Sequence, residues 1–344
     1  MWIWDKHGQG KVTKKPKAYL ALDKLPVIQG YDFSKQFDSQ KFLQQYLHMG
    51  FQGSHLGIGI QIFQEMLLLK QRGKAMKIFL ACTGNMISSG NRELITYLVR
   101  EKLIDCIVTT AAGIEEDVIK CVKPFHLGSF DVKGSFLQEE NIGRIGNIFA
   151  PYDRYVYLER VLNGFFAAIE KEKTSVSTEQ FCAHLGNYLE REEHTKTHCE
   201  SSFLFWASKH RIPVFCPGIT DGAIGDVAIF FKKSHPKFQI DVMQDNVALT
   251  DLLLNTELAG SIVLGGGIAK HFLLNAAIFR DGFEYSISLT TAGEFDGSDS
   301  GGNPEEAISW NKIKPEAKRI KIVADATITF PLLLAGGLCS KQKK

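Results

Sequence analysis

One acidic, glycine-rich stretch, residues 294–314, contains the side chains best suited to chemistry. Its sequence, EFDGSDSGGNPEEAISWNKIK, holds Asp299 and Glu306 and then places Trp310 two residues before Lys312. Carboxylates in a pocket bind cations, and a lysine beside an apolar ring loses its proton more readily than an exposed lysine. The neutral amine is a nucleophile toward a carbonyl or imine carbon. The alternative is an acidic surface loop followed by an ordinary exposed lysine.

A pattern of strand, polar loop and helix recurs along the chain. These elements must position the reactive groups. The first strand begins at Lys77 in KIFLACTG and precedes a helix over 85–99. The second spans 105–113 and precedes a helix that opens on Glu115 and Glu116. This repetition predicts an α/β fold with a parallel sheet and helices on its faces. Further helices are predicted over 39–46, 58–69, 152–193 and 245–254, and further strands over 211–218 and 285–289.

Ligands bind such sheets at the carboxyl ends of strands, which makes residues 83–89 and 109–116 candidate binding loops. Ordinary connecting loops are the alternative for either segment. Asp325 ends the last predicted strand, where an acidic side chain can hold a ribose hydroxyl.

A triple-glycine turn at 265–267 follows another predicted strand and opens a helix at Ile268. The free N–H groups and the helix dipole at such a point suit a phosphate or pyrophosphate. The turn is not a complete GxGxxG motif, because Lys270 stands where the last glycine would be. His271 and Asn275 lie four residues apart and therefore share a helix face, although a lone helix histidine is more often structural than catalytic.

The composition of the 344-residue chain narrows the function classes. The net charge of +2 argues against a general nucleic-acid binder, and no apolar run approaches the ~20 residues of a membrane span. The N-terminus is charged at once and lacks an apolar secretory segment. Seven cysteines without CxxC spacing predict reduced thiols in a cytoplasmic protein. His194, His198 and Cys199 invite a metal, but no further ligand completes a geometry, so none is expected.

Composition also divides the chain into three parts. Residues 1–29 form a lysine-rich arm without periodicity, 30–338 form a single large domain, and 339–344 form a short tail. The arm is either a free tail or a segment that docks on another surface. Trp2 and Trp4 favour docking, because each ring can bury about 150–250 Å².

Six stretches of the chain resemble the deoxyhypusine synthase family: CTGNMISSGNRE, VTTAAGIEEDVIKC, TDGAIGD, LGGGIAKH, EFDGSDSGGNPEEAISWNKI and VADATITFPLL. The match runs from about Gly30 to Leu334. It implies a Rossmann-like, NAD-binding single domain with helices on both faces of the sheet. It also implies a homotetramer with active sites at dimer interfaces, and N-terminal segments that pack over the active-site mouth of a neighbouring subunit.

The reaction that this resemblance implies begins with NAD-dependent dehydrogenation of spermidine. The resulting aminobutyl group passes through an imine on an enzyme lysine to a lysine of the hypusine-bearing translation initiation factor precursor. The product imine is then reduced. Bound NAD stays through the cycle, so a closed, water-poor site would protect the imine.

The resemblance also assigns roles to residues. Lys312 matches the imine-forming lysine, and His271 matches a histidine proposed to move protons. The polyamine-binding positions match Glu115, Asp226, Asn275, Gly297, Asp299, Glu306 and Trp310. The NAD-binding positions match Asn85, Met86, Ile87, Ser88, Thr110, Ala111, Ala112, Glu116, Asp221, Gly266, Thr291, Ala292, Asp296, Ser298, Ser300, Asp325 and Ala326.

Two departures from the family pattern leave alternatives open. Gly84 stands where many members have serine, and Ser288 stands where eukaryotic members carry a pocket tyrosine. Gly84 bears on one cofactor contact, and Ser288 bears on the fit of the polyamine and the choice of acceptor. One alternative is a homospermidine synthase or another aminobutyl transferase with a small amine as acceptor. A non-catalytic regulatory subunit is another alternative, which the presence of both Lys312 and His271 disfavours.

Overall fold

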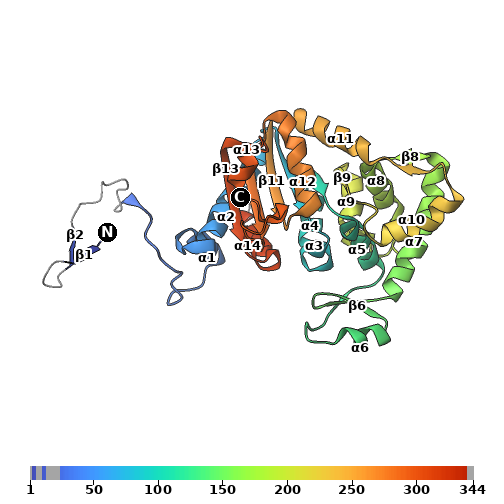
Figure 1. Cartoon of the computed structure of the whole chain (residues 1–344), viewed down its shortest axis with the longest axis horizontal. Coiled ribbons are helices and arrows are strands. Elements are labelled where there is room, and N and C mark those ends of the chain that lie inside the picture. The colour runs from blue at the N-terminus through green and yellow to red at the C-terminus, as the bar shows by residue number, and fades with distance from the viewer. Residues whose placement is uncertain (1, 5–9, 13–23, 339–344) are drawn as a thin grey trace.

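A six-stranded sheet forms the centre of the computed structural model, which describes residues 2–4, 10–12 and 24–338 (Figure 1). Its strands are β3 (Met76–Cys82), β4 (Cys106–Val108), β9 (Val214–Phe215), β11 (Leu258–Leu264), β12 (Phe283–Thr290) and β13 (Ile313–Val323). Every neighbouring pair is parallel, and the order across the sheet is β9-β4-β3-β11-β12-β13. Renumbered in chain order, this is 3-2-1-4-5-6, the arrangement of doubly wound nucleotide-binding sheets. The predicted Rossmann-like α/β class is confirmed.

Helices cover both faces of this sheet (Figure 1). The longer ones are α2 (Phe51–Gln71), α4 (Asn91–Arg100), α5 (Ala111–Val122), α7 (Asp153–Glu172), α8 (Thr178–Tyr188), α9 (Phe203–His210), α10 (Ala223–Ser234), α11 (Val242–Leu254), α12 (Gly267–Ala276) and α14 (Ala326–Leu338). The shorter ones are α1 (Ser39–Gln45), α3 (Asn85–Ser88), α6 (Gly134–Glu139) and α13 (Pro304–Ser309). Single 3₁₀ turns are η2 (Tyr46–His48), η3 (Cys199–Ser201), η4 (Ala277–Arg280) and η5 (Asp299–Gly301).

Alternate strand side chains pack against two different helical layers. On β3, Ile78 and Leu80 belong to the core shared with α2, α4 and α14, whereas Phe79 and Ala81 belong to the core shared with α11 and α12. Successive side chains of a strand point to opposite faces of a sheet. A parallel strand covered on both faces has no polar side, and this explains the near-continuous apolar runs of β3 and β11.

Several helix boundaries differ from the prediction; α2 and α11 begin seven and three residues earlier than predicted, and three further differences have clear causes or consequences. The helix predicted over 85–99 is two helices, α3 and α4, because Ser89 is extended (φ −79°, ψ −179°) and ends α3. The helix predicted to open on Glu115 begins four residues earlier, at Ala111, because extended Thr110 turns the chain directly after β4. The segment 152–193 contains α7 and α8, separated by β8 (Ser175–Val176).

Smaller elements lie outside the central sheet. Strands β5 (His126–Leu127), β7 (Ile148–Pro151) and β6 (Ile142–Ile145) form an antiparallel lobe with α6, and β8 pairs with β10 (Gln239–Ile240). In the arm, β1 (Trp2–Trp4) pairs with β2 (Gly10–Val12). Residues 1, 5–9, 13–23 and 339–344 and the side chains of Trp2 and Trp4 lie outside the described part, so the docking of the arm stays a prediction.

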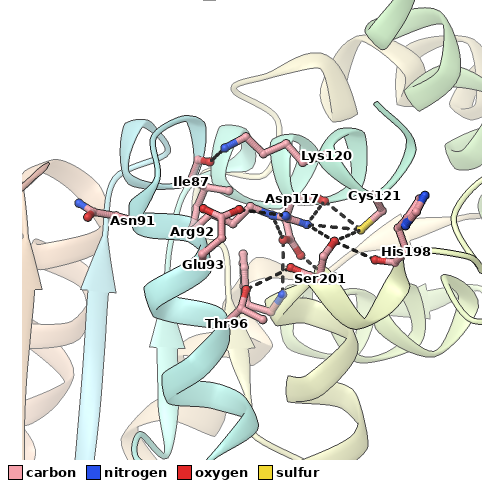
Figure 2. Close-up of polar contacts among 12 residues, drawn as sticks. Ile87, Asn91, Arg92, Glu93, Thr96, Asp117, Lys120, Cys121, His198 and Ser201 are labelled. Carbon is pink, nitrogen blue, oxygen red and sulfur yellow. Dashed lines mark hydrogen bonds and ion pairs between the residues drawn. The ribbon is translucent and has the colours of Figure 1, made fainter. Parts of the chain in front are cut away.

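A buried ion pair joins helices α4 and α5 and also contacts the start of α9 (Figure 2). The Arg92 guanidinium on α4 donates from Nε to Asp117 Oδ1 on α5 at 2.7 Å, and the two side chains are 3% and 0% exposed. Asp117 Oδ2 also accepts from Ser202 Oγ at 2.5 Å and from the Leu204 N–H at 3.2 Å, at the start of α9. A buried charge pair is stable only when further hydrogen bonds satisfy both partners, and here they do.

We therefore predict that Asp117→Ala lowers the free energy of unfolding by about 3–5 kcal/mol, because it leaves the Arg92 charge buried without its partner. Chemical denaturation of the purified protein measures this loss. The matched control is Asp153→Ala, which removes a half-exposed carboxylate paired with Arg154 at 2.6 Å and should change stability by about 1 kcal/mol or less. Equal losses in the two variants would contradict the assignment of Asp117 as an anchor.

Candidate active site

A first cavity lies where the winding of the sheet reverses, between the carboxyl ends of β3 and β11. At the end of β3, the Thr83 N–H donates to Leu264 O of β11 at 3.2 Å, and directly after β11 the Gly265 N–H donates to Leu289 O of β12 at 2.8 Å. Beyond these bonds, the segments that follow β3 and β11 part. The cavity measures about 540 Å³, and we call it the switch-point cavity. Eight of the predicted NAD-binding residues line it: Asn85, Met86, Gly266, Thr291, Ala292, Ser300, Asp325 and Ala326.

The triple-glycine turn forms one wall of this cavity. Gly265 (φ +86°) and Gly267 (φ +60°) occupy the left-handed region, which side chains disfavour. A Cβ on Gly266 would overlap the Ser300 side chain, and Ser300 Oγ accepts from the Gly267 N–H at 3.1 Å. The absence of side chains in the turn therefore lets η5 pack against the start of α12. The amino end of a helix suits a phosphate.

Helix α3 forms the opposite wall and packs on α5. A Cβ on Gly84 would lie 2.5 Å from the Ala112 Cβ. A side chain at position 84 would thus require α3 and α5 to move apart.

Glu116, in the second turn of α5, has an environment that the sequence does not reveal. It is buried and its Oε2 accepts a hydrogen bond from Ser88 Oγ. Burial raises the pKa of Glu116 to about 7, with a smaller contribution from the charge of Glu115. The carboxyl therefore titrates near neutral pH in the folded protein without ligands.

The remaining predicted NAD-binding residues fall into three groups. Ile87, Ser88, Thr110, Ala111, Ala112 and Glu116 belong to α3 and the start of α5, behind the wall of the cavity. Asp221 lines a different cavity, described below. Asp296 and Ser298 lie on an exposed loop with the predicted polyamine residue Gly297, where Asp296 Oδ1 accepts from the Ser298 N–H at 2.8 Å.

Lys312 lies in a second, narrow pocket between α12, η5, α13 and the sheet. The pocket measures about 40 Å³, and four predicted residues line it together: Asp299, Glu306, Trp310 and Lys312. The backbone of Lys312 is held at both ends, because its N–H donates to Ala307 O at 2.9 Å and its carbonyl accepts from the Phe283 N–H at 3.1 Å. We call this the lysine pocket. Ser288, the second departure from the family pattern, also lines it.

Lys270 is a member of the lysine pocket to which the sequence analysis gave no role. Its side chain is buried, its Nζ donates to the carbonyl of Asp299, and Nζ lies 3.9 Å from Asp299 Oδ2. Burial lowers the pKa of Lys270, and the charges of Lys321 and Lys312 act in the same direction. The sequence marked position 270 only as the missing glycine of a motif, and its lysine carried no further signal.

A third cavity, of about 840 Å³, is acidic. Glu115, Asp221 and Asp226 line it, together with Tyr155 and Arg144. Glu115 Oε2 accepts from the Ile224 N–H at the start of α10 at 3.0 Å. Burial raises the pKa of Glu115, and Asp226 and Asp221 raise it further. A cation bound here would relieve the repulsion among these carboxylates.

His271 and Asn275 lie in a fourth place, an open apolar groove of about 580 Å³ between α11, α12 and η4. Asn275 Nδ2 and His271 Nδ1 are 2.9 Å apart, so the two residues share a helix face as predicted. The groove also exposes Met243, Ile268 and Phe279, of which Phe279 is 68% exposed. Within one chain, the predicted catalytic residues Lys312 and His271 therefore line separate cavities.

Three further observations concern the described residues as a whole. No group of three or more histidine, cysteine, aspartate or glutamate side chains in residues 2–4, 10–12 and 24–338 could hold a metal ion. In the same part of the chain, no helix is both long and apolar enough to cross a membrane. The six cysteines of that part are free and buried.

The fold and these pockets define a doubly wound α/β protein with a nucleotide-type crevice and adjoining lysine and carboxylate pockets. The deoxyhypusine synthase family model matches residues 41–336. A probable deoxyhypusine synthase of Methanocaldococcus jannaschii is 47% identical over 295 residues, which are 84% of this chain and 89% of the relative. The deoxyhypusine synthase of Caenorhabditis elegans is 38% identical over 335 residues, 90% of this chain and 88% of the relative.

A solved structure shows the same fold. It is a crystal structure of an Entamoeba histolytica protein provisionally assigned as a deoxyhypusine synthase, with a TM-score of 0.63 and 23% identity, covering 90% of this chain and 96% of the other. The chain belongs to the deoxyhypusine synthase family, whose members are transferases of hypusine biosynthesis.

The raised pKa of Glu116 gives a pH-dependent prediction for the protein without ligands. A carboxyl with a pKa of 4.5 when unfolded and about 7 when folded makes stability fall as pH rises between these values. Glu116→Gln removes this loss, so its stability advantage over the wild type should grow from near zero at about pH 4 to as much as about 3 kcal/mol at about pH 8. Denaturant titrations across this range test it, with exposed Glu93→Gln as the control. An advantage that does not vary with pH would contradict the burial of an ionisable carboxyl.

Proposed function

We propose that this chain is a deoxyhypusine synthase of the cytoplasm. It transfers the aminobutyl group of spermidine, through an imine on Lys312, to a specific lysine of the hypusine-bearing translation initiation factor precursor. The observation that carries the proposal is the lysine pocket: Lys312, Trp310, Asp299 and Glu306 line one small cavity in a chain of this family. A polyamine requires this combination of carboxylates, an apolar wall and a nearby amine.

The residues of the switch-point cavity fit NAD. The glycine turn lets the backbone approach a pyrophosphate, α12 begins there with the positive end of its dipole, and Asp325 lines the cavity, where a ribose hydroxyl can be held. Asp325 Oδ1 already accepts from the Thr327 N–H at 2.7 Å, which fixes the carboxylate at the start of α14. When bound, NAD accepts a hydride from the substrate and later returns it.

The chain's own residues supply the remaining chemistry. Asp299 and Glu306 bind ammonium ends of the polyamine through charge-assisted hydrogen bonds, and the Trp310 ring covers the methylene stem. Lys312, when neutral, attacks the imine carbon of the oxidised substrate. A new C–N bond to Nζ forms as the bond to the diaminopropane portion breaks, and the departing amine takes up a proton. Attack by the acceptor lysine on the same carbon then releases Lys312.

A second copy of the chain completes the site in this proposal. The acidic cavity with Glu115 and Asp226 and the groove with His271 are separate from the lysine pocket in one chain. The exposed apolar side chains of the groove, including Met243 and Phe279, favour contact with another copy. We therefore propose a homotetramer whose active sites lie at dimer interfaces, as the family resemblance implies.

A small-amine acceptor remains the second candidate because Ser288, and not a tyrosine, lines the lysine pocket. A homospermidine synthase would use the same Lys312 chemistry and differ only in the final acceptor. Incubation with NAD, spermidine and either the purified precursor protein or putrescine distinguishes the two. Transfer to putrescine alone would favour the second candidate.

We predict that Lys312→Ala abolishes aminobutyl transfer but leaves NAD binding intact, because this side chain forms the covalent intermediate. Borohydride treatment of wild type with NAD and spermidine should trap an adduct that peptide mass spectrometry maps to Lys312. The matched control is Lys314→Ala, whose ammonium pairs with Glu284 at 2.7 Å outside the pocket and whose loss should leave trapping unchanged. An adduct on Lys270, the other lysine of the pocket, would overturn the assignment.

Asp299→Asn and Glu306→Gln should each weaken spermidine binding about 10- to 100-fold, because a charge-assisted hydrogen bond contributes about 1.5–3 kcal/mol. NAD binding should change far less, since neither carboxylate lines the switch-point cavity. Calorimetric titration of each ligand measures both effects. The control is Glu305→Gln, a neighbouring carboxylate held by Arg319 at 2.5 Å. Equal weakening of both ligands would mean that the acids shape the loop and do not hold the polyamine.

A further inference from the structure

The carboxyl end of α3 is held by one ammonium group from the neighbouring helix α5. Lys120 Nζ donates to the carbonyl oxygens of Ile87 at 2.7 Å, Ser88 at 2.7 Å and Ser89 at 3.1 Å. Figure 2 shows Lys120 extending from α5 toward the Ile87 carbonyl. A lysine has three N–H donors, so this contact uses all of them.

Helix α3 needs such support because it contains only four residues, Asn85–Ser88. A helix this short is not stable by itself, and its last carbonyl groups have no partner within the helix. A cation at the carboxyl end satisfies these groups and interacts favourably with the helix dipole. Ser89 O accepts one further bond, from the Arg92 N–H at 3.4 Å, as α4 begins.

The surroundings of Lys120 show that its charge is directed at α3. Among the ion pairs of the described residues, none includes Lys120. Its Nζ lies 5.8 Å from the centre of the Phe125 ring, and one turn earlier on α5 the Glu116 carboxylate accepts from Ser88 Oγ. Two side chains of α5 therefore hold the same end of α3: Lys120 binds its backbone carbonyl groups, and Glu116 accepts from the Ser88 hydroxyl.

We infer that Lys120 is a positioning residue for the cofactor: by capping α3, it fixes the wall of the switch-point cavity that Asn85, Met86 and Ser89 form. This inference rests on the proposed function for the identity of the ligand. Its structural part, that Lys120 keeps α3 folded and in place, does not depend on the ligand.

The test replaces Lys120 by Met, which keeps much of the side-chain length and removes the charge and every donor. In Lys120→Met, the affinity for NAD should fall about 10-fold or more, and the KM for NAD should rise while kcat at saturating NAD changes little. Hydrogen exchange should accelerate at the Ser88 and Ser89 amides, which donate to Gly84 O and Asn85 O at 3.1 Å each, and not in the central strands.

Two further variants complete the design. Lys120→Arg keeps a charged donor and should recover part of the affinity and protection. Lys123→Met, one turn later on α5, removes a surface lysine paired with Asp153 at 2.9 Å and should change neither. If Lys120→Met cannot be purified folded, Lys120→Arg carries the test: a partial loss of NAD affinity together with faster exchange confined to residues 87–89 supports the cap, and either change without the other contradicts it.

Three results would overturn the inference. The first is that Lys120→Met changes neither the NAD affinity nor hydrogen exchange at residues 87–89. The second is faster exchange spread evenly over the whole domain. The third is a fall in kcat with an unchanged KM for NAD. If wild type itself does not bind NAD, the proposed function fails, and hydrogen exchange alone then decides whether Lys120 holds α3.

Discussion

The parallel pairing of β3 with β11 is the constraint on which the rest of the structure depends. These two strands lie side by side, but the chain leaves them toward opposite faces of the sheet, through α3 and α4 after β3 and through α12 after β11. The loops at their carboxyl ends must therefore part, and a crevice opens between them. The glycine turn, η5, α3 and the start of α14 all take their positions around that crevice.

The sequence predicts this framework well because burial on both faces leaves a simple pattern. Apolar runs at 77–82 and 261–264, each followed by polar or glycine residues and a helix, correspond to β3 and β11 to within a few residues. The acidic stretch also brings Asp299, Glu306, Trp310 and Lys312 to one pocket, because α13 and the start of β13 keep these residues close along the chain. Local spacing was enough in both cases.

Long-range contacts account for what the sequence did not reveal. The carboxyl end of α3 is held by Lys120, more than 30 residues later, whose contacts with three carbonyl groups leave no pattern in the sequence. Lys270 seemed only to interrupt a glycine motif, yet it is a buried cation of the lysine pocket. The separation of His271 from Lys312 also could not be predicted, because it depends on which face of α12 the histidine occupies.

Asp226, like His271, lies in a cavity separate from the pocket of Lys312 within one chain. The central claim is that each active site combines such groups from two copies of the chain, and this can be tested directly. Lys312→Ala and Asp226→Ala proteins carrying different tags are co-expressed, mixed assemblies are isolated through both tags, and aminobutyl transfer is measured. Each variant alone should be inactive. In a mixed pair, one of the two sites receives the intact Lys312 from one copy and the intact Asp226 from the other, so transfer should return. If every site were built within one chain, each would retain a defect, and mixed assemblies as inactive as the single variants would contradict the account.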